Sequence, residues 1–241
     1  LDLDDPEVYK LLQRCDTTGV FQLESNGMRG YLKKLRADCF EDIVAMLALY
    51  RPGPLDAGMV DDYIQVKHGA KVRYPHEMLE EILKPTNGVF LYQEQVMKSA
   101  QVMAGYSLGG ADILRRAMGK KKVEEMAEQR QVFVTGAGKK NIKEKKANEI
   151  FDLIDKFSGY GFNKSHAVSY SVLSFQCAWL LNYYPAEWMA AFLDKEPEGR
   201  KEEAINIAKR SGFEIKLLDI NTSGTQWDIS DNGRTLIQPL N

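Results

Sequence analysis

Apolar side chains recur three and four positions apart through most of the first 195 residues, which is the spacing that places them on one face of an α-helix. The segments 40–50, 96–103 and 143–157 show this spacing. Residues 167–193 are mostly apolar and contain Pro185, which predicts one or two helices broken at the proline. The pattern therefore predicts a mainly α-helical region.

The pattern changes after residue 196. A predicted helix over 201–211 is followed by three strand-like runs, at 213–218, 226–230 and 235–240. Asp231-Asn232-Gly233 predicts a hairpin turn between the last two runs. We expect a mainly α protein, with a multi-helical domain over residues 1–195 and a small α+β segment over 196–241 that begins a following subdomain.

The composition is typical of a globular protein, with 44% hydrophobic and 27% charged residues among 241. The formal net charge is −2, so contacts with nucleic acid must come from local patches. Cys15, Cys39 and Cys177 are widely spaced, which favours reduced thiols over a disulfide framework or a zinc site. With no signal pattern and no apolar run of about 18 residues, we expect a cytoplasmic protein without a membrane partner, cut from a longer chain.

Cationic residues collect in two stretches. In the first, Arg115 and Arg116 follow Asp112 by three and four residues, so ion pairs along one helix can hold both guanidinium groups. A guanidinium group binds two phosphate oxygens at once and keeps its charge. The alternative is a solvated helix face with ordinary ion pairs, and the spacing alone leaves it open.

Three lysines follow that first stretch. Gly119 is expected to end the helix and to direct the lysines towards a polyanion, and 123–135 is expected to form a further helix before a solvated loop at 136–141. A triple lysine is also common on an ordinary solvated surface. The lysines are Lys120, Lys121 and Lys122.

The second stretch predicts an unusual helix start. Asn163 fits an N-cap, which places Lys164, Ser165 and His166 in the first helical turn. Because the helix dipole disfavours cations there, we expect an anion to compensate for them. Tyr170 lies four residues after His166, so its ring would share that face and could lie against a sugar or base. The alternative is a histidine and a tyrosine hydrogen-bonded in the core.

Carboxylates for a divalent metal are not evident beside these stretches. The pairs Asp4-Asp5 and Asp61-Asp62 fit helix caps or solvated helix faces. The residues alone therefore indicate a chain that binds a nucleotide or nucleic-acid phosphates, holds no metal and contributes no catalytic residue.

Several motifs resemble those of bacterial replicative DNA polymerase III alpha subunits, which are C-family polymerases. They occur in order over residues 1 to about 195: Phe21-Gln22-Leu23-Glu24-Ser25, Tyr50-Arg51-Pro52-Gly53-Pro54-Leu55, Tyr92-Gln93-Glu94-Gln95-Val96-Met97, 104–122, 159–167 and Tyr184-Pro185-Ala186-Glu187. The resemblance implies the fingers region of a DNA-directed DNA polymerase, a nucleotidyltransferase of DNA replication. The palm domain, whose aspartates hold two magnesium ions, would precede this chain, so the fragment alone is expected to be inactive and Mg2+ to act in the full enzyme.

The resemblance also implies partners and roles. The partners are the incoming dNTP, template-primer DNA, the palm domain of the same polypeptide, and other replisome subunits through regions outside this chain. The nucleotide site would comprise Arg115, Arg116, Asn163, Lys164, Ser165, His166 and Tyr170, and the DNA contacts Lys120, Lys121, Lys122 and Arg51. The residues themselves indicate no role for Arg51 or for Gln93-Glu94-Gln95. The rival hypothesis is a stand-alone helical nucleic-acid-binding or interaction module without a nucleotide pocket.

Overall fold

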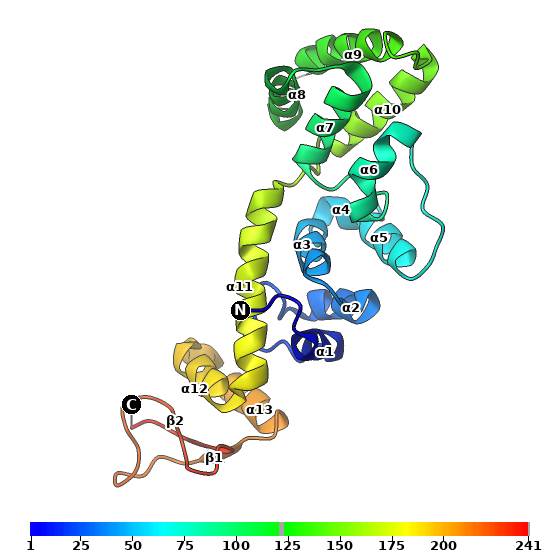
Figure 1. Ribbon diagram of the computed structural model, residues 1–241. Helices are drawn as coiled ribbons and strands as arrows, with labels where there is room; N and C mark the ends of the chain where they lie inside the picture. Colours follow the sequence, from blue (N-terminus) through cyan, green and yellow to red (C-terminus); the bar gives the residue numbers. More distant parts are fainter. Residues whose placement is uncertain (121–122, 241) are drawn as a thin grey trace. The chain divides into compact units, whose positions relative to one another are not determined.

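The computed structural model describes residues 1–120 and 123–240, apart from the side chain of Lys120 (Figure 1). The described residues form thirteen α-helices, three short 3-10 helices and one small sheet. This confirms the expected fold class, mainly α with a small α+β part at the C-terminal end. Among these residues, no helix combines the length and the apolar character that crossing a bilayer requires.

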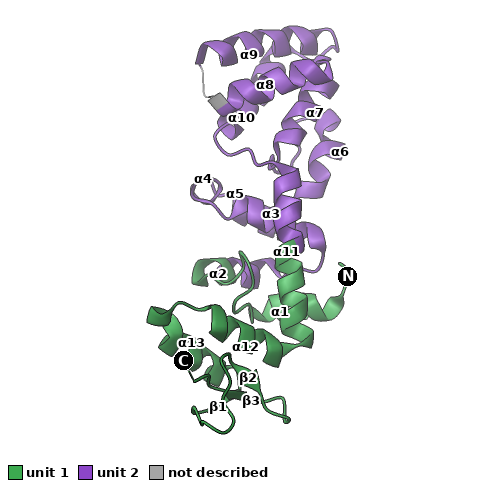
Figure 2. Ribbon diagram, turned by 90° about the vertical axis from the view of Figure 1, so that its left-hand side faces the viewer, with its two compact units in different colours: residues 1–29, 173–241 green, residues 30–172 purple. Residues whose placement is uncertain are grey.

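The chain divides into two compact units, which Figure 2 shows in different colours. Unit 1 comprises residues 1–29 and 173–241, and unit 2 comprises residues 30–172. The boundary predicted at residue 196 falls inside unit 1, and the division there stays a prediction.

The regular elements described in unit 2 are all helices, of which α2 and α11 are shared with unit 1. The 3-10 helices of unit 2 are η1 (Glu77–Leu79) and η2 (Lys84–Thr86). Its α-helices are α2 (Asn26–Leu35), α3 (Phe40–Leu49), α4 (Pro52–Asp56), α5 (Met59–Lys67), α6 (Glu80–Leu83), α7 (Gln93–Ala104), α8 (Leu108–Lys120), α9 (Val123–Gly138), α10 (Glu144–Phe157) and α11 (Lys164–Tyr183).

Helices α7 to α10, in the upper part of Figure 1, share one hydrophobic core in which α7 contacts both α8 and α9. Ile150, Ile154 and Phe157 of α10 recur at helical spacing and are buried, as the sequence predicts, whereas Leu153, expected on the same buried face, is 42% exposed. Phe133 of α9 and Phe151 of α10 are fully buried, with ring centroids 5.6 Å apart. Burial of a side chain of this size stabilises the fold by about 1.5–3 kcal/mol. The core thereby fixes the position of α8 on α7.

Two predicted helix ends are wrong. Helix α8 continues through Gly119, because Ala117 and Met118 just before it are buried in the core, and a glycine inside a helix costs only about 1 kcal/mol. Helix α9 continues to Gly138 rather than ending near residue 135. At Gly136 a Cβ atom would collide with the backbone carbonyl of Ala104, so this glycine lets α9 cross close to the end of α7.

Unit 1 contains the predicted α+β part. Its remaining elements are α1 (Pro6–Arg14), α12 (Pro185–Lys195), η3 (Glu198–Arg200), α13 (Lys201–Arg210), β1 (Glu214–Lys216), β2 (Asp228–Ile229) and β3 (Thr235–Ile237). Strand β3 lies in the middle of the sheet, parallel to β1 and antiparallel to β2. Leu236, buried opposite Ile215 and Ile229, joins the sheet to a core that includes Trp227. The hairpin between β2 and β3 and the helix break before Pro185 confirm two predictions.

Candidate nucleotide-binding site

The arginines of α8 are held by one carboxylate on their own helix. Arg115 donates from Nε to Oδ1 of Asp112 at 2.8 Å, and Nη2 of Arg116 lies 2.8 Å from Oδ2 of the same residue. The hydrogen bond from Arg115 lowers the pKa of Asp112 below its usual 3.8. The side chains of Arg115 and Arg116 remain 35% and 66% exposed. The predicted ion pairs are confirmed, and both guanidinium groups stay open to a second anion.

Lys120 is the last residue of α8, and its side chain lies outside the described part of the structure, as do Lys121 and Lys122. Their predicted contact with DNA phosphates stays a prediction.

The first turn of α11 already has an anion. Asn163 caps the helix as predicted, because its Oδ1 accepts a hydrogen bond from the His166 backbone N–H at 2.9 Å. The backbone N–H of Lys164 donates to both carboxylate oxygens of Glu94, at 3.1 and 3.2 Å. The anion expected from the cationic helix start is therefore supplied by α7. That argument no longer requires a bound phosphate.

An aromatic surface lies beside this turn. The rings of His166 and Tyr170 are 4.2 Å apart between centroids, which confirms that they share a face, and Phe162 lies 5.6 Å from His166. His166 is exposed, so a buried core histidine is excluded. Lys164 and Ser165 are also exposed, and Nζ of Lys164 lies 5.5 Å from the Tyr92 ring centroid. Such a surface can stack a base or sugar next to a cation.

Arg51 has a role that the sequence did not indicate. Its Nε donates to the carbonyl of Ala48 at 2.8 Å, and its Nη2 donates to the carbonyl of Tyr160 at 2.6 Å. The guanidinium carbon lies 4.5 Å from the Phe162 ring centroid. The group is half-buried, and this burial lowers the pKa of Arg51. Arg51 thus fixes the segment that enters α11, and its predicted DNA contact stays a prediction.

Gly53 supports the same contact. A Cβ atom there would collide with the Tyr160 ring, so only glycine lets the first turn of α4 lie against that ring. The Pro52-Gly53-Pro54 motif was the sequence signal for this turn, but nothing in it named Tyr160 as the partner.

The Gln93-Glu94-Gln95 run also gains a role. Residues 91–93 and 161–162 pair as short extended segments: Gln93 N–H donates to the Phe162 carbonyl at 2.9 Å, and Phe162 N–H donates to the Leu91 carbonyl at 3.2 Å. Buried Gln95 accepts from the N–H groups of Leu91 and Tyr92, at 2.8 and 2.9 Å. The first turn of α7 therefore anchors the first turn of α11.

Both cationic stretches are attached to α7, one along its length and one at its start. The cavity that Lys164 lines, about 490 Å³, is completed by residues of α3, α6 and α7 and includes neither Arg115 nor Arg116. A second cavity of about 730 Å³ lies at the other end of α7 and is lined by Ser107, Gly110 and Lys139. The structure thus joins the two stretches through one helix, and Arg115 and Arg116 line neither of these two cavities.

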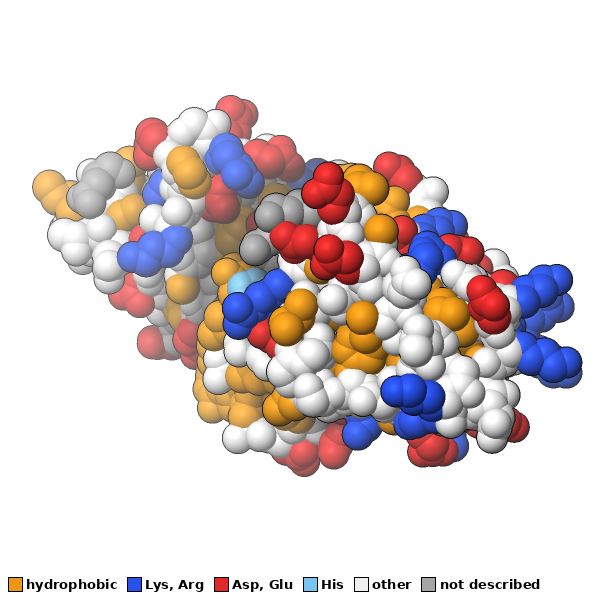
Figure 3. All heavy atoms as spheres, turned by 90° about the horizontal axis from the view of Figure 1, so that it is seen from above, with side chains coloured by type: hydrophobic (Ala, Val, Ile, Leu, Met, Phe, Trp, Pro, Cys, Tyr) orange, Lys and Arg blue, Asp and Glu red, His pale blue; other side chains and the backbone are white. Residues whose placement is uncertain are grey.

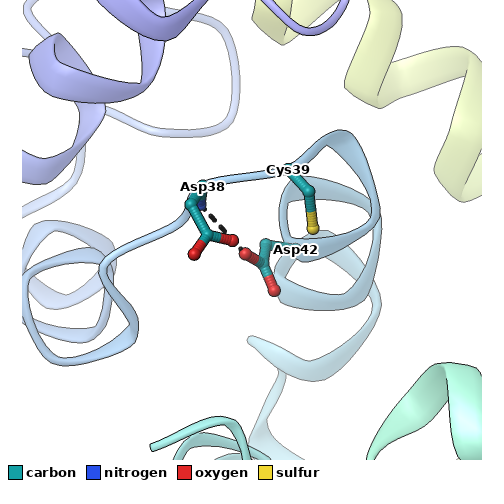
Figure 4. A group of neighbouring side chains, drawn as sticks. All are labelled: Asp38, Cys39 and Asp42. Atoms are coloured by element: carbon teal, nitrogen blue, oxygen red, sulfur yellow. Dashed lines mark hydrogen bonds between the residues drawn. The ribbon is translucent and has the colours of Figure 1, made fainter.

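Among the residues that the structure describes, one group has the geometry to suggest a metal ion. Asp38, Cys39 and Asp42 lie together at the start of α3 (Figure 4). The ammonium group of Lys67 lies 2.7 Å from a carboxylate oxygen of each aspartate, and its hydrogen bond lowers the pKa of Asp38. Burial raises the pKa of the Cys39 thiol to about 11, so it stays protonated. Lys67 already supplies the positive charge here, in a buried ion pair with Asp42 and a second ion pair with exposed Asp38.

Charged side chains are mixed on the surface. On the face that Figure 3 shows, most lysine and arginine side chains of the described residues lie among acidic and apolar ones, and only a few at the right-hand edge adjoin one another. This agrees with the net charge of −2 and favours local phosphate contacts over a general polyanion surface.

The family model of the bacterial DNA polymerase III alpha subunit finger domain matches residues 1–141. The chain belongs to this family. The finger-domain chain is 52% identical over 242 residues to the DNA polymerase III subunit alpha of Pseudomonas fluorescens, 51% over 241 residues to that of Vibrio cholerae, and 50% over 241 residues to that of Escherichia coli K12. Each match covers 97% of this chain and 21% of the relative, so the chain spans about a fifth of the length of these relatives.

Proposed function

We propose that this chain is the part of a replicative DNA polymerase that binds the triphosphate of the incoming dNTP and the end of the template-primer DNA. The observation that carries the proposal is the presentation of Arg115 and Arg116 side by side on α8 by one carboxylate, in a chain of the finger-domain family. Two guanidinium groups that stay accessible and permanently charged suit a ligand with several anionic oxygens.

Binding of this kind is sufficient for a large kinetic effect. Phosphoryl transfer depends mostly on positioning and on charge stabilisation, so cations outside the catalytic acid and base groups can contribute strongly. We propose that Lys164 and the α11 turn contact the same nucleotide, with the rings of His166 and Tyr170 against its sugar or base. Lys120, Lys121, Lys122 and Arg51 are proposed to face the DNA backbone.

The magnesium ions are proposed to be held by another part of the parent polymerase. Mg2+ requires free carboxylate oxygens, and in the described Asp38–Asp42 group these are engaged by Lys67. When bound, the ions would supply charge stabilisation at the reacting phosphate. The fragment by itself is proposed not to extend a primer, and a palm domain of the same polypeptide is its proposed partner.

The test uses the whole parent polymerase with Arg115→Ala and Arg116→Ala, separately and together. Each variant is expected to raise KM for dNTP or to lower kcat about 10-fold or more, because a charge-assisted hydrogen bond contributes about 1.5–3 kcal/mol. Lys146→Ala removes a solvent-facing cation of α10 and serves as the matched control. Unchanged kinetics in the arginine variants would contradict the proposal.

The rival, a stand-alone nucleic-acid-binding module, makes a different prediction. It requires the isolated chain to bind DNA with a steep salt dependence that dNTP does not alter. A titration of labelled primer-template with the chain, with and without dNTP, separates the two.

A further inference from the structure

We infer that Arg51 and Glu94 are positioning residues that fix the first turn of α11 for the nucleotide; the inference rests on the proposed function. Neither residue needs to touch the dNTP. Arg51 binds the segment that enters the turn, at the Tyr160 carbonyl, and Glu94 of α7 binds the turn itself, at the Lys164 N–H. Together they determine where the exposed side chains of Lys164 and His166 stand.

Glu94 lies at the meeting point of two helix starts. It belongs to the first turn of α7, and its two carboxylate oxygens accept from the first N–H group of α11. Each helix N-terminus carries about half a positive charge, so a single carboxylate stabilises both. This arrangement accounts for a lysine at the start of α11, because the negative charge that Lys164 requires is already in place.

Arg51 acts through a chain of stacked groups. Its guanidinium group stacks on Phe162 at 4.5 Å, Phe162 lies 5.6 Å from His166, and His166 lies 4.2 Å from Tyr170. The series begins at a half-buried cation and ends at exposed His166 and half-buried Tyr170, the rings that are proposed to meet the nucleotide. Lysine cannot reproduce it, because an ammonium group lacks the planar fork that bonds two carbonyls while stacking on a ring. A shift of Arg51 would therefore move His166.

Hydrogen bonds to backbone carbonyls fix the orientation of the segment that leads into α11. Arg51 holds the carbonyl of Tyr160, and Gln93 Nε2 donates to the carbonyl of Gly161 at 3.3 Å. Two consecutive carbonyls of the segment before α11 are thus fixed by residues from two separate parts of the chain. A segment held in this way has one orientation, which is the requirement for placing phosphate contacts within a fraction of an ångström.

The experiment measures KM for dNTP and kcat in the whole parent polymerase carrying Arg51→Lys, Glu94→Ala or Glu94→Gln. We expect the first two to raise KM for dNTP about 10-fold or more. Glu94→Gln keeps one acceptor oxygen but removes the negative charge, so a rise in KM smaller than that of Glu94→Ala is expected. Glu81→Ala, which removes an exposed carboxylate lining the same cavity as Glu94, is the control and should leave KM unchanged.

Thermal melts of the same proteins, with kinetics recorded well below each Tm, separate positioning from folding. A lower Tm with wild-type KM in both Arg51→Lys and Glu94→Ala would overturn the inference, since the residues would then be structural only. A lower KM in Glu94→Ala would also overturn it, because Glu94 would then compete with the phosphates.

Arg115→Ala in the same assay distinguishes failure of this inference from failure of the proposed function. If it raises KM while the Arg51 and Glu94 variants do not, only this inference fails; if it also leaves KM unchanged, the proposed function fails.

Discussion

Arg115 and Arg116 are held by a carboxylate three and four residues away on their own helix. The first turn of α11 is instead held by residues far along the chain. Glu94 lies 70 positions from Lys164, and Arg51 lies 109 positions from Tyr160 in the segment that enters the turn. Exposed ion pairs within a helix contribute little and can rearrange when a ligand arrives. Contacts between distant segments form only in the complete fold. The ion pairs of α8 are therefore free to rearrange, whereas the first turn of α11 is held in place.

The largest expected difference concerns stability. Arg51→Ala should lower the free energy of unfolding by about 2–4 kcal/mol, because two hydrogen bonds from a charged group and one ring contact are lost. Arg116→Ala should change it by less than about 0.5 kcal/mol. Urea denaturation of the chain, followed by far-UV circular dichroism, provides both values. Equal losses of unfolding free energy in the two variants would contradict the difference between the two stretches.

A smaller difference is expected between two glycines. Gly53→Ala should destabilise the chain by about 1–3 kcal/mol, because the new methyl group collides with the Tyr160 ring. Gly109→Ala in α8 meets no atom within 4 Å and should stabilise the chain by up to about 1 kcal/mol, the helix preference of alanine over glycine. The same denaturation assay applies. Destabilisation by Gly109→Ala would show that α8 is more constrained than its contacts suggest.

The sequence predicts those features of the site that depend on residues close together along the chain. The Asp112 ion pairs, the Asn163 cap and the shared face of His166 and Tyr170 depend on spacings of three or four residues, and all are confirmed. The roles of Arg51 and Glu94 depend on partners far along the chain, which no local pattern specifies. For the same reason the end of α9 was misplaced, since Gly136 serves its packing against α7.

The helix caps should show where the two stretches are alike. Ser107 Oγ accepts from Gly110 N–H at 3.0 Å at the start of α8, as Asn163 Oδ1 accepts from His166 N–H in α11. Each alanine replacement is expected to cost about 1 kcal/mol. Similar losses of stability in the two variants would mean that α8 and the first turn of α11 differ only in their long-range contacts. A much larger loss for Asn163→Ala would mean that the cap also supports the Arg51 and Glu94 contacts.

The smallest effect is the titration of Asp112. Its folded pKa lies below 3.8 because Arg115 donates a hydrogen bond to the carboxylate. The ionised form therefore favours folding above the unfolded pKa, and this contribution disappears as the pH falls through the folded pKa. NMR titration of the side-chain carboxyl should show the pKa rising towards 3.8 in Arg115→Ala. An unchanged pKa would mean that Arg115 does not hold the carboxylate in solution.

The central claim is that α8 and the α11 turn hold one nucleotide between them. The most direct measurement is the dissociation constant of dNTP from the parent polymerase bound to primer-template, for Arg115→Ala and for Lys164→Ala. The account predicts that each variant weakens dNTP binding about 10-fold or more while DNA affinity changes little. Wild-type dNTP affinity in either variant would contradict it.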